Sequence, residues 1–156
     1  MAKESEIATQ LGLKQDPEPL RFLAEAGFLW LDLRNFDEAG RVFEALCALA
    51  PDDPIGHIGL GDVERMRGNW REALALYDRA AHCSNNAARS LAMIFRKQGE
   101  THALAKDSTK AIAAFERAIT LDPSSDEAAT AREYIAVLNR RPELPTVSQS
   151  ESKRQN

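Results

Sequence analysis

Cysteine, basic charge and long apolar runs are scarce in this chain, and each shortage excludes a class of protein. Two cysteines, Cys47 and Cys83, in 156 residues are too few for a disulfide-stapled secreted domain. Acidic residues outnumber basic ones by 24 to 20, and the resulting net charge of -4 argues against a nucleic-acid-binding protein, which needs a basic face. Clustered bases occur only near the C-terminal end, where we interpret them as solvated charge.

Signals for export or membrane insertion are missing as well. The first ten residues, MAKESEIATQ, lack the apolar core of a signal peptide. No apolar run approaches the ~18 residues that a membrane-spanning helix needs. The two cysteines fall on the apolar faces of predicted helices, which is typical of buried thiols in a reducing compartment. The sequence therefore predicts a soluble, cytoplasmic protein with no membrane insertion.

Catalytic and metal-binding motifs are also lacking. The histidines are His57, His82 and His102, and no two of them have the i, i+4 spacing of a helical metal site. The sequence has no glycine-rich phosphate loop and no G-x-S-x-G nucleophile motif. We therefore expect neither an enzyme nor a cofactor nor a metal site, and we interpret His102 as a packing residue.

What the chain does contain is a repeated helical pattern. In Phe36–Ile58, small or apolar residues recur at helical spacing on one face, and Pro51 and Pro54 then end one helix and permit the next. A glycine, an alanine, an aromatic and a further small or apolar residue recur with offsets of 34 and then 38. The matching sets are Gly27, Gly61 and Gly99; Ala39, Ala73 and Ala111; Phe43, Tyr77 and Phe115; and Leu46, Ala80 and Ala118.

Each recurring residue type has a physical reason. Glycine and alanine permit two helices to cross closely, since a larger side chain would hold them apart. The aromatic residue fills the space between the helices and the next repeat, so Phe43, Tyr77 and Phe115 should be buried. Pro51 and Pro123 end the second helix of the first and third units. The pattern predicts an all-α fold of three helix-turn-helix repeats and a capping helix.

The register gives approximate bounds for each element. First helices are expected at Leu20–Leu33, Pro54–Arg67 and Asn86–Ala105, second helices at Asp37–Ala50, Arg71–His82 and Ser108–Leu121, and a capping helix at Ser124–Arg140 with Ser125 as its N-cap. Four extra residues near 84–89 either lengthen the first helix of the third repeat by about one turn or form a longer loop.

The ends of the chain have different compositions from the repeats. We expect an N-terminal arm at residues 1–19, with a short helix over Glu4–Lys14 that carries Ile7 and Leu11 on one face. Repeats and cap would occupy residues 20–140. The polar, proline- and serine-rich residues 141–156 are expected to form a disordered tail.

A period of 34 with these residues resembles the tetratricopeptide repeat family. The resemblance implies a right-handed solenoid whose first helices line a concave groove. It also implies a non-enzymatic protein that binds an extended peptide or a helix of another protein.

The segment from Val42 to Tyr77 further resembles the class II chaperones of bacterial type III secretion. The residues that carry this resemblance are Phe43, Leu46, Cys47, Gly59, Leu60 and Gly61. It implies a chaperone for a translocator protein and a homodimer formed through an N-terminal helical arm. The alternative is a generic scaffold or adaptor that assembles a multiprotein complex, because a fold does not fix a function.

The family register also implies which side chains line the groove. The predicted partner-binding residues are Phe28, Leu31, Ile55, Ile58, Asp62, Arg65, Met66, Met93 and Arg96. Apolar members would form pockets, and Arg65 and Arg96 would contact peptide carbonyls or carboxylates. Some relatives clamp a partner's terminal carboxylate with an asparagine where this chain has Phe28, which disfavours that mode here. In the competing interpretation, several of these residues pack against the chain's own N-terminal segment or tail.

Overall fold

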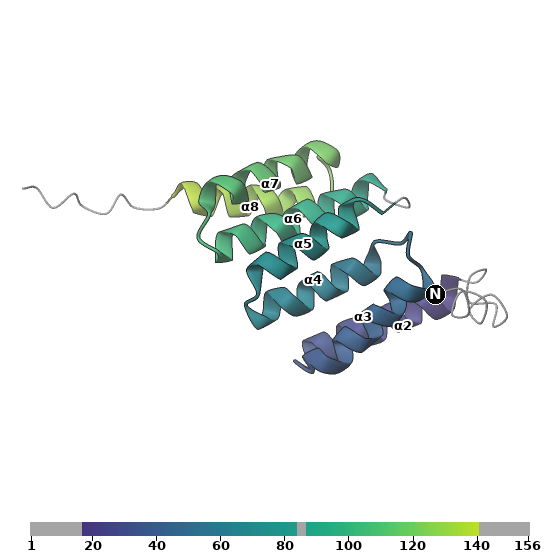
Figure 1. Cartoon of the computed structure of the whole chain (residues 1–156). Helices are drawn as coiled ribbons and strands as arrows, with labels where there is room; N and C mark the ends of the chain where they lie inside the picture. Colours follow the sequence, from purple (N-terminus) through teal and green to yellow (C-terminus); the bar gives the residue numbers. More distant parts are fainter. Residues whose placement is uncertain (1–16, 84–86, 141–156) are drawn as a thin grey trace, which may run out of the picture.

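The computed structural model describes residues 17–83 and 87–140, and within these ranges its regular structure is entirely α-helical. The helices are α2 (Pro17–Asp32), α3 (Phe36–Leu49), α4 (Ile55–Arg67), α5 (Trp70–Ala81), α6 (Ala88–Leu104), α7 (Ser108–Leu121) and α8 (Asp126–Asn139) (Figure 1). None of these described helices combines the length and apolar character that crossing a membrane would require. The predicted short helix at Glu4–Lys14 and the predicted tail lie outside the described residues.

The predicted helix bounds agree with the structure to within three residues where both ends are described. The four extra residues lengthen a helix, which decides between the two alternatives: α6 has 17 residues and its counterpart α4 has 13. The all-α fold class is therefore confirmed.

Caps and turns explain why the helices begin and end where they do. The side chains of Asn35 and Asp107 accept hydrogen bonds from backbone N–H groups in the first turns of α3 and α7, and Ser125 does the same for α8, as predicted. The residue before each cap in the first and third repeats has positive φ, 58° at Arg34 and 64° at Lys106. These residues reverse the chain between the two helices of a repeat.

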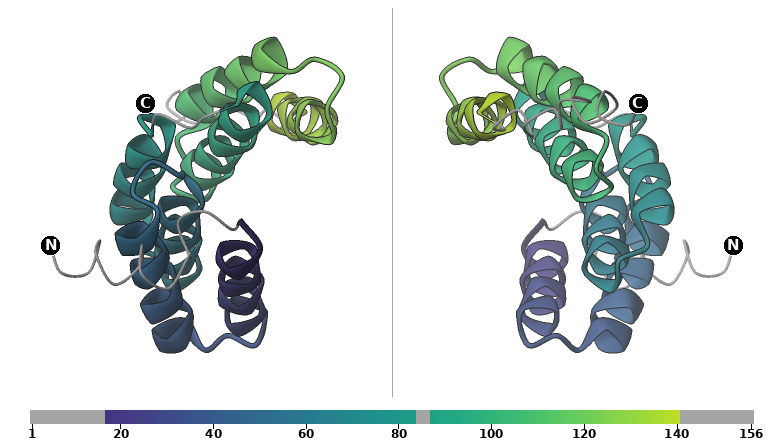
Figure 2. Two further views of the ribbon diagram at one scale, coloured as in Figure 1. Left: turned by 90° about the vertical axis from the view of Figure 1, so that its right-hand side faces the viewer. Right: turned by 90° about the vertical axis from the view of Figure 1, so that its left-hand side faces the viewer.

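The helices form two layers that curve into an arc. Helices α2, α4, α6 and α8 make the inner, concave layer, while α3, α5 and α7 make the outer layer (Figure 2). Consecutive helices pack against each other, and α2 also contacts α4, as α6 contacts α8. The first helices of the three repeats thus share the concave side.

The repeated glycine and aromatic positions meet in the core. Phe43, Tyr77 and Phe115 are each fully buried, which confirms the prediction. A Cβ added at Gly61 would lie 2.5 Å from the Tyr77 ring, and one at Gly99 would lie 2.6 Å from the Phe115 ring. Each of these glycines comes sixteen residues before its aromatic partner. Glycine is required because the ring occupies the volume that any side chain would need.

Candidate partner-binding surface

The predicted groove residues lie on α2, α4 and α6, so they belong to the inner layer, but their exposure differs widely. Ile58 is only 1% exposed and packs in a core cluster with Tyr77 and Ile94. Ile58, which we predicted as a groove residue, therefore belongs to the inter-helix core and cannot itself form a pocket for a partner. Helix α4 lies inside the layer and packs against α3 and α5 and also against α2, which leaves it a narrower free face than the register alone suggests.

Leu31 is also buried, with 6% of its surface exposed, in the first core cluster. The half-buried apolar residues are Phe28, Ile55, Met66 and Met93. The first three pack against the same cluster as Leu31, and Met93 packs against the cluster around Ile58. The Phe28 ring meets the Phe43 ring edge-on, with centroids 5.0 Å apart. These four side chains combine a buried base with a part that solvent or a partner can reach.

A buried carboxylate organises the charged part of the inner layer. One oxygen of Asp62 accepts a hydrogen bond from the Tyr77 hydroxyl at 2.6 Å, and the other accepts one from Lys97 Nζ at 2.7 Å. Arg65 Nε donates to the Tyr77 oxygen at 3.3 Å. Since Asp62 and Tyr77 come from the second repeat and Lys97 from the third, the network joins α4 and α5 to α6.

This environment shifts the pKa values of its members. Burial raises the pKa of Tyr77, and the negative charge of Asp62 raises it further, so the phenol stays protonated and donates to the carboxylate. Burial alone would lower the pKa of Arg65, but Tyr77 and Asp62 raise it overall. The Tyr77 phenol therefore stays neutral and the Arg65 guanidinium stays charged over the physiological pH range.

A second charged network joins α6 to α8. Arg96 pairs with Glu100 on its own helix and with Glu127 on α8. Burial opposes the charge on Arg96, but the two carboxylates raise its pKa above the ordinary value. Both arginines that we expected to meet a peptide are thus already engaged within the chain.

Sequence reasoning missed Lys97 and Glu127, which complete the two networks. A signal for Lys97 was present: it lies 35 residues after Asp62, close to one repeat length, so stacking places the two on neighbouring inner helices. No comparable signal marks Glu127, because the capping helix does not share the repeat register.

A cysteine thiol and a histidine imidazole meet between α3 and α4. Cys47 Sγ is 3.5 Å from His57 Nδ1, a contact that the sequence analysis did not predict. Burial, followed by the nearby Cys83 and Glu44, raises the pKa of the Cys47 thiol to about 11, so the thiol stays protonated near neutral pH. Among the described residues, no group of three or more His, Cys, Asp or Glu side chains could hold a metal ion.

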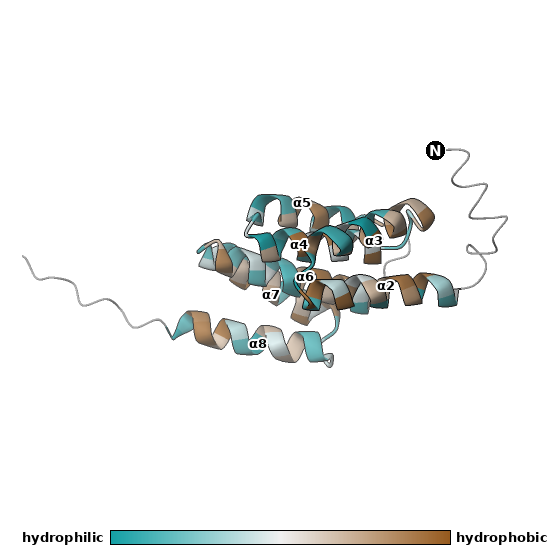
Figure 3. Cartoon of the chain, turned by 90° about the horizontal axis from the view of Figure 1, so that it is seen from below, coloured by the Kyte–Doolittle hydropathy of each residue, from teal (hydrophilic) through white to brown (hydrophobic). Residues whose placement is uncertain are grey.

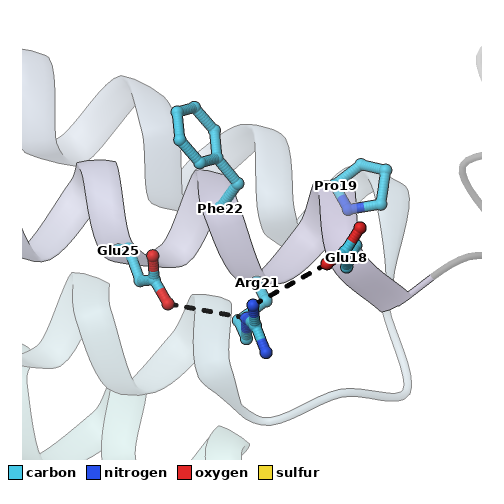
Figure 4. A pocket seen from close by; sticks show the side chains of 5 residues that line it. All are labelled: Glu18, Pro19, Arg21, Phe22 and Glu25. Carbon is cyan, nitrogen blue, oxygen red and sulfur yellow. Dashed lines mark ion pairs between the residues drawn. The ribbon is translucent and has the colours of Figure 1, made fainter.

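Two surface depressions lie away from the predicted groove residues. One is at the start of α2, where Arg21 forms ion pairs with Glu18 and Glu25 beside Pro19 and Phe22 (Figure 4). The other lies where the α4–α5 turn meets the end of α6 and includes Trp70, His102 and Lys110. Neither contains a cluster suited to catalysis.

Comparison with known proteins agrees with this architecture. Residues 52–124 match the family model of the tetratricopeptide repeat. No relative among the curated proteins matches the chain. The match and the three stacked helix pairs together confirm the predicted resemblance: the protein has a tetratricopeptide-type solenoid.

Solved structures with this fold include type III secretion chaperones. PcrH from Pseudomonas aeruginosa is 25% identical with a TM-score of 0.66, and the alignment covers 80% of this chain and 94% of PcrH. The translocator chaperone SycD from Yersinia enterocolitica is 19% identical with a TM-score of 0.69, covering 83% of this chain and 98% of SycD. A type III secretion complex from Aeromonas hydrophila is 23% identical with a TM-score of 0.65, covering 80% and 83%. The finer resemblance predicted from the sequence is thus confirmed at the level of the fold.

Proposed function

We propose that this protein is a non-enzymatic, cytoplasmic chaperone that binds an extended, partly apolar segment of a translocator protein on its concave side. The observation that carries the proposal is the set of half-buried apolar side chains on three successive inner helices, namely Phe28, Ile55, Met66 and Met93. Such residues supply binding energy when a partner removes their exposed part from water.

Structural neighbours that were solved with segments of other proteins support the proposal. PcrH has been solved with the chaperone-binding region of PopD, and that PcrH structure is 25% identical to this chain with a TM-score of 0.66. SycD has been solved with a peptide of the translocator YopD. In the proposed complex, Leu31 and Ile58 support the contact residues from beneath, and the Asp62 and Arg96 networks fix the spacing of α4, α6 and α8.

Ile55 offers the sharpest test of the surface. It is the first residue of α4, where the positive end of the helix stabilises a carboxylate. Ile55→Glu should therefore leave the fold intact. Ala75→Glu is the matched control, because it adds the same charge at an exposed position of α5 in the outer layer.

The experiment begins with a pull-down from the native host and mass spectrometry, and a peptide scan of the partner then maps the bound segment. Calorimetry with that peptide should show that Ile55→Glu weakens binding by ~2 kcal/mol or more, roughly 30-fold, as at interface hot spots. Ala75→Glu should bind like the wild type. Equal affinity of the wild type and Ile55→Glu would place the binding surface elsewhere.

A scaffold that joins stable proteins is the second candidate, favoured by the similarity to the first repeat domain of Spaghetti (RPAP3) solved with an HSP90 peptide. That match has 17% identity and a TM-score of 0.64, covers 80% of this chain and 93% of the other, and reflects the fold alone. Expression of the partner by itself separates the two functions. A chaperone's client becomes soluble only with this protein, whereas a scaffold's partner is soluble without it.

A further inference from the structure

The junction between the second and third repeats carries a cleft that the proposed function does not use. Its volume is about 690 Å³, within the range of roughly 300–1,000 Å³ that is usual for ligand sites. The lining comes from the α4–α5 turn, from α5, and from the end of α6 and the start of α7. The α4–α5 and α6–α7 turns lie at the same end of the helix stack (Figure 1). We call this depression the junction cleft.

The corresponding junction between the first and second repeats carries two arginine side chains. Arg34 lies over the Phe36 ring, with its Cζ atom 5.4 Å from the ring centroid. Arg67, at the end of α4, pairs with Asp37 on α3 at 2.6 Å and so crosses from one repeat to the other. The first junction therefore supplies its own cations, one on an aromatic ring and one in an ion pair.

The repeat offsets of 34 and 38 residues show what stands in place of these arginines at the second junction. Their counterparts are Gly68 and Ala105, and both of these small residues line the junction cleft. Trp70 is the counterpart of the phenylalanine and lines the cleft as well. The second junction is therefore open because two long side chains are replaced by short ones, and it keeps the aromatic residue on which an arginine lies at the first junction.

The charged side chains of the junction cleft favour a cation over an anion. Three carboxylates and two cations line it, namely Glu72, Asp78, Asp107, Arg71 and Lys110. Lys110 Nζ pairs with Asp107 at 3.1 Å, so these two charges offset each other. Glu72 and Asp78 then remain against Arg71, and the cleft attracts positive charge.

Two neighbouring groups leave this balance unchanged. Gln98 Nε2 donates to Asp78 Oδ1 at 2.7 Å, and the carboxylate can still accept further hydrogen bonds. His102 lines the cleft and adds no charge near neutral pH, because burial lowers its pKa. Helix α5, which forms one wall, carries both hydrophilic and hydrophobic residues (Figure 3). A ligand in the cleft therefore meets apolar surface beside carboxylates.

We propose that the junction cleft binds an arginine side chain presented by a partner protein. The planar guanidinium would lie on Trp70, as Arg34 lies on its ring at the first junction, and would donate to the carboxylates of Glu72 and Asp78. Tryptophan is the ring that attracts a cation most strongly, and arginine can both stack on a ring and donate to a carboxylate. The cleft lies away from the concave residues, so this inference is independent of the proposed function.

NMR titration of the full chain tests the chemistry of the ligand. The probes are acetyl-Gly-Arg-Gly-amide and its counterparts with glutamine or glutamate in the centre. We expect only the arginine peptide to shift the indole N–H resonance of Trp70, which a Trp30→Phe variant assigns, with half-saturation in the millimolar range. Glu72→Gln/Asp78→Asn should weaken this binding at least ~10-fold. Asparagine still accepts the hydrogen bond from Gln98, so the fold should be kept.

Two charge-matched variants test the place of binding. Arg71→Asp/Ala105→Arg rebuilds across the junction cleft the ion pair that Arg67 makes with Asp37 at the first junction, and it should abolish binding of the arginine peptide. Arg71→Asp/Leu104→Arg carries the same charges, but Leu104 does not line the cleft. This control should bind the peptide at least as tightly as the wild type, because it loses the cation that opposes the ligand.

Three results would overturn the proposal. The first is a shift of the Trp70 resonance by the glutamine peptide equal to that by the arginine peptide, or a larger one by the glutamate peptide. The second is equal binding of the arginine peptide by the two charge-matched variants. The third is a shift of the cleft resonances with protein concentration alone, which would assign the junction cleft to a second copy of the chain.

Discussion

Phe115 shows how one side chain joins the last repeat to the cap. It is fully buried, Gly99 lies against one part of its ring, and the Tyr134 ring from α8 stacks on it with centroids 5.1 Å apart. Removing the ring would therefore empty a site bordered by three helices, α6, α7 and α8. The surrounding helices cannot all move in to refill it, because each is fixed by its own neighbours.

We expect Phe115→Ala to lower the free energy of unfolding by ~3–5 kcal/mol, the usual cost of deleting a buried aromatic ring. Tyr134→Ala is the control: Tyr134 is 39% exposed, so its loss should cost clearly less. Urea denaturation of the three proteins measures both changes. A loss below about 1 kcal/mol for Phe115→Ala would mean that the ring does not hold α8 against the third repeat.

Two half-buried histidines make stability depend on pH. Burial lowers the pKa of His57, and the charge of Arg79 lowers it further. Burial also lowers the pKa of His102, although Asp107 and Asp78 oppose the shift. Below the ordinary histidine pKa of about 6.5, the unfolded chain therefore binds more protons than the folded chain, and stability falls as the pH falls through this region.

The melting temperature should accordingly drop between pH 7.5 and pH 5.5. The double variant His57→Gln/His102→Gln should show a smaller drop than the wild type, since glutamine does not titrate. Differential scanning calorimetry at a series of pH values gives the comparison. Identical pH profiles would show that the two imidazoles have the same proton affinity in the folded and unfolded chain.

The helices could be predicted closely because their limits depend on local chemistry. Proline, glycine and capping side chains act within a few residues, and the period of 34 repeats the same choices. The turns hold a further regularity that the sequence analysis missed. Arg34, Gly68 and Lys106 all have positive φ and are spaced by 34 and 38 residues, the offsets of the core positions. Only one of them is glycine, and this hid the pattern.

Contacts between helices of different repeats depend on charged pairs as well as on the core. The Asp62 side chain is 3% exposed and that of Lys97 is 13% exposed, and their ion pair joins α4 to α6. A buried carboxylate that loses its partner is strongly destabilising, whereas removing both charges together costs less than the separate losses imply. A double-mutant cycle separates the pair from its surroundings.

The losses in the free energy of unfolding caused by Lys97→Met and by Asp62→Asn should therefore not add up in the double variant. We expect Lys97→Met alone to lower the free energy of unfolding by ~3 kcal/mol, and the coupling energy of the pair to be ~1–3 kcal/mol. Urea denaturation of the four proteins provides the cycle. Strict additivity would mean that the two side chains contribute independently and that the ion pair does not hold the inner layer together.

At the scale of the molecule, the sequence predicted the solenoid better than the surface on it. The repeat register placed Ile55 and Ile58 on the same inner helix but could not separate them. Ile55, the first residue of α4, is half-buried, while Ile58 is fully buried against α5 and α6. Likewise, Arg65 and Arg96 were predicted as groove residues, yet each is paired within the chain, Arg65 with Tyr77 on α5 and Arg96 with Glu127 on α8. Burial and pairing depend on the curvature of the arc, which no local pattern specifies.

A solenoid leaves an apolar face at its last repeat unless a cap covers it, and α8 is that cap here. Ala128 and Ala131 are fully buried, Ile135 and Leu138 pack against the cluster around Phe115, and Glu127 pairs with Arg96. A chain that ends at Ser125 should therefore melt at least ~10 °C lower than the full chain, because a loss of several kcal/mol has that effect in a domain of this size.

Truncation at Arg140 is the matched control for removal of the cap, since it keeps all of α8 and removes only residues 141–156. From the composition of these residues we predict a melting temperature within about 2 °C of the full chain. Light scattering during the melts should also show association only for the chain that ends at Ser125, because that chain alone exposes the apolar face of α7. If the two truncated chains have the same melting temperature, α8 does not stabilise the repeats. If truncation at Arg140 alone causes a large drop, the tail itself packs against the folded part of the molecule.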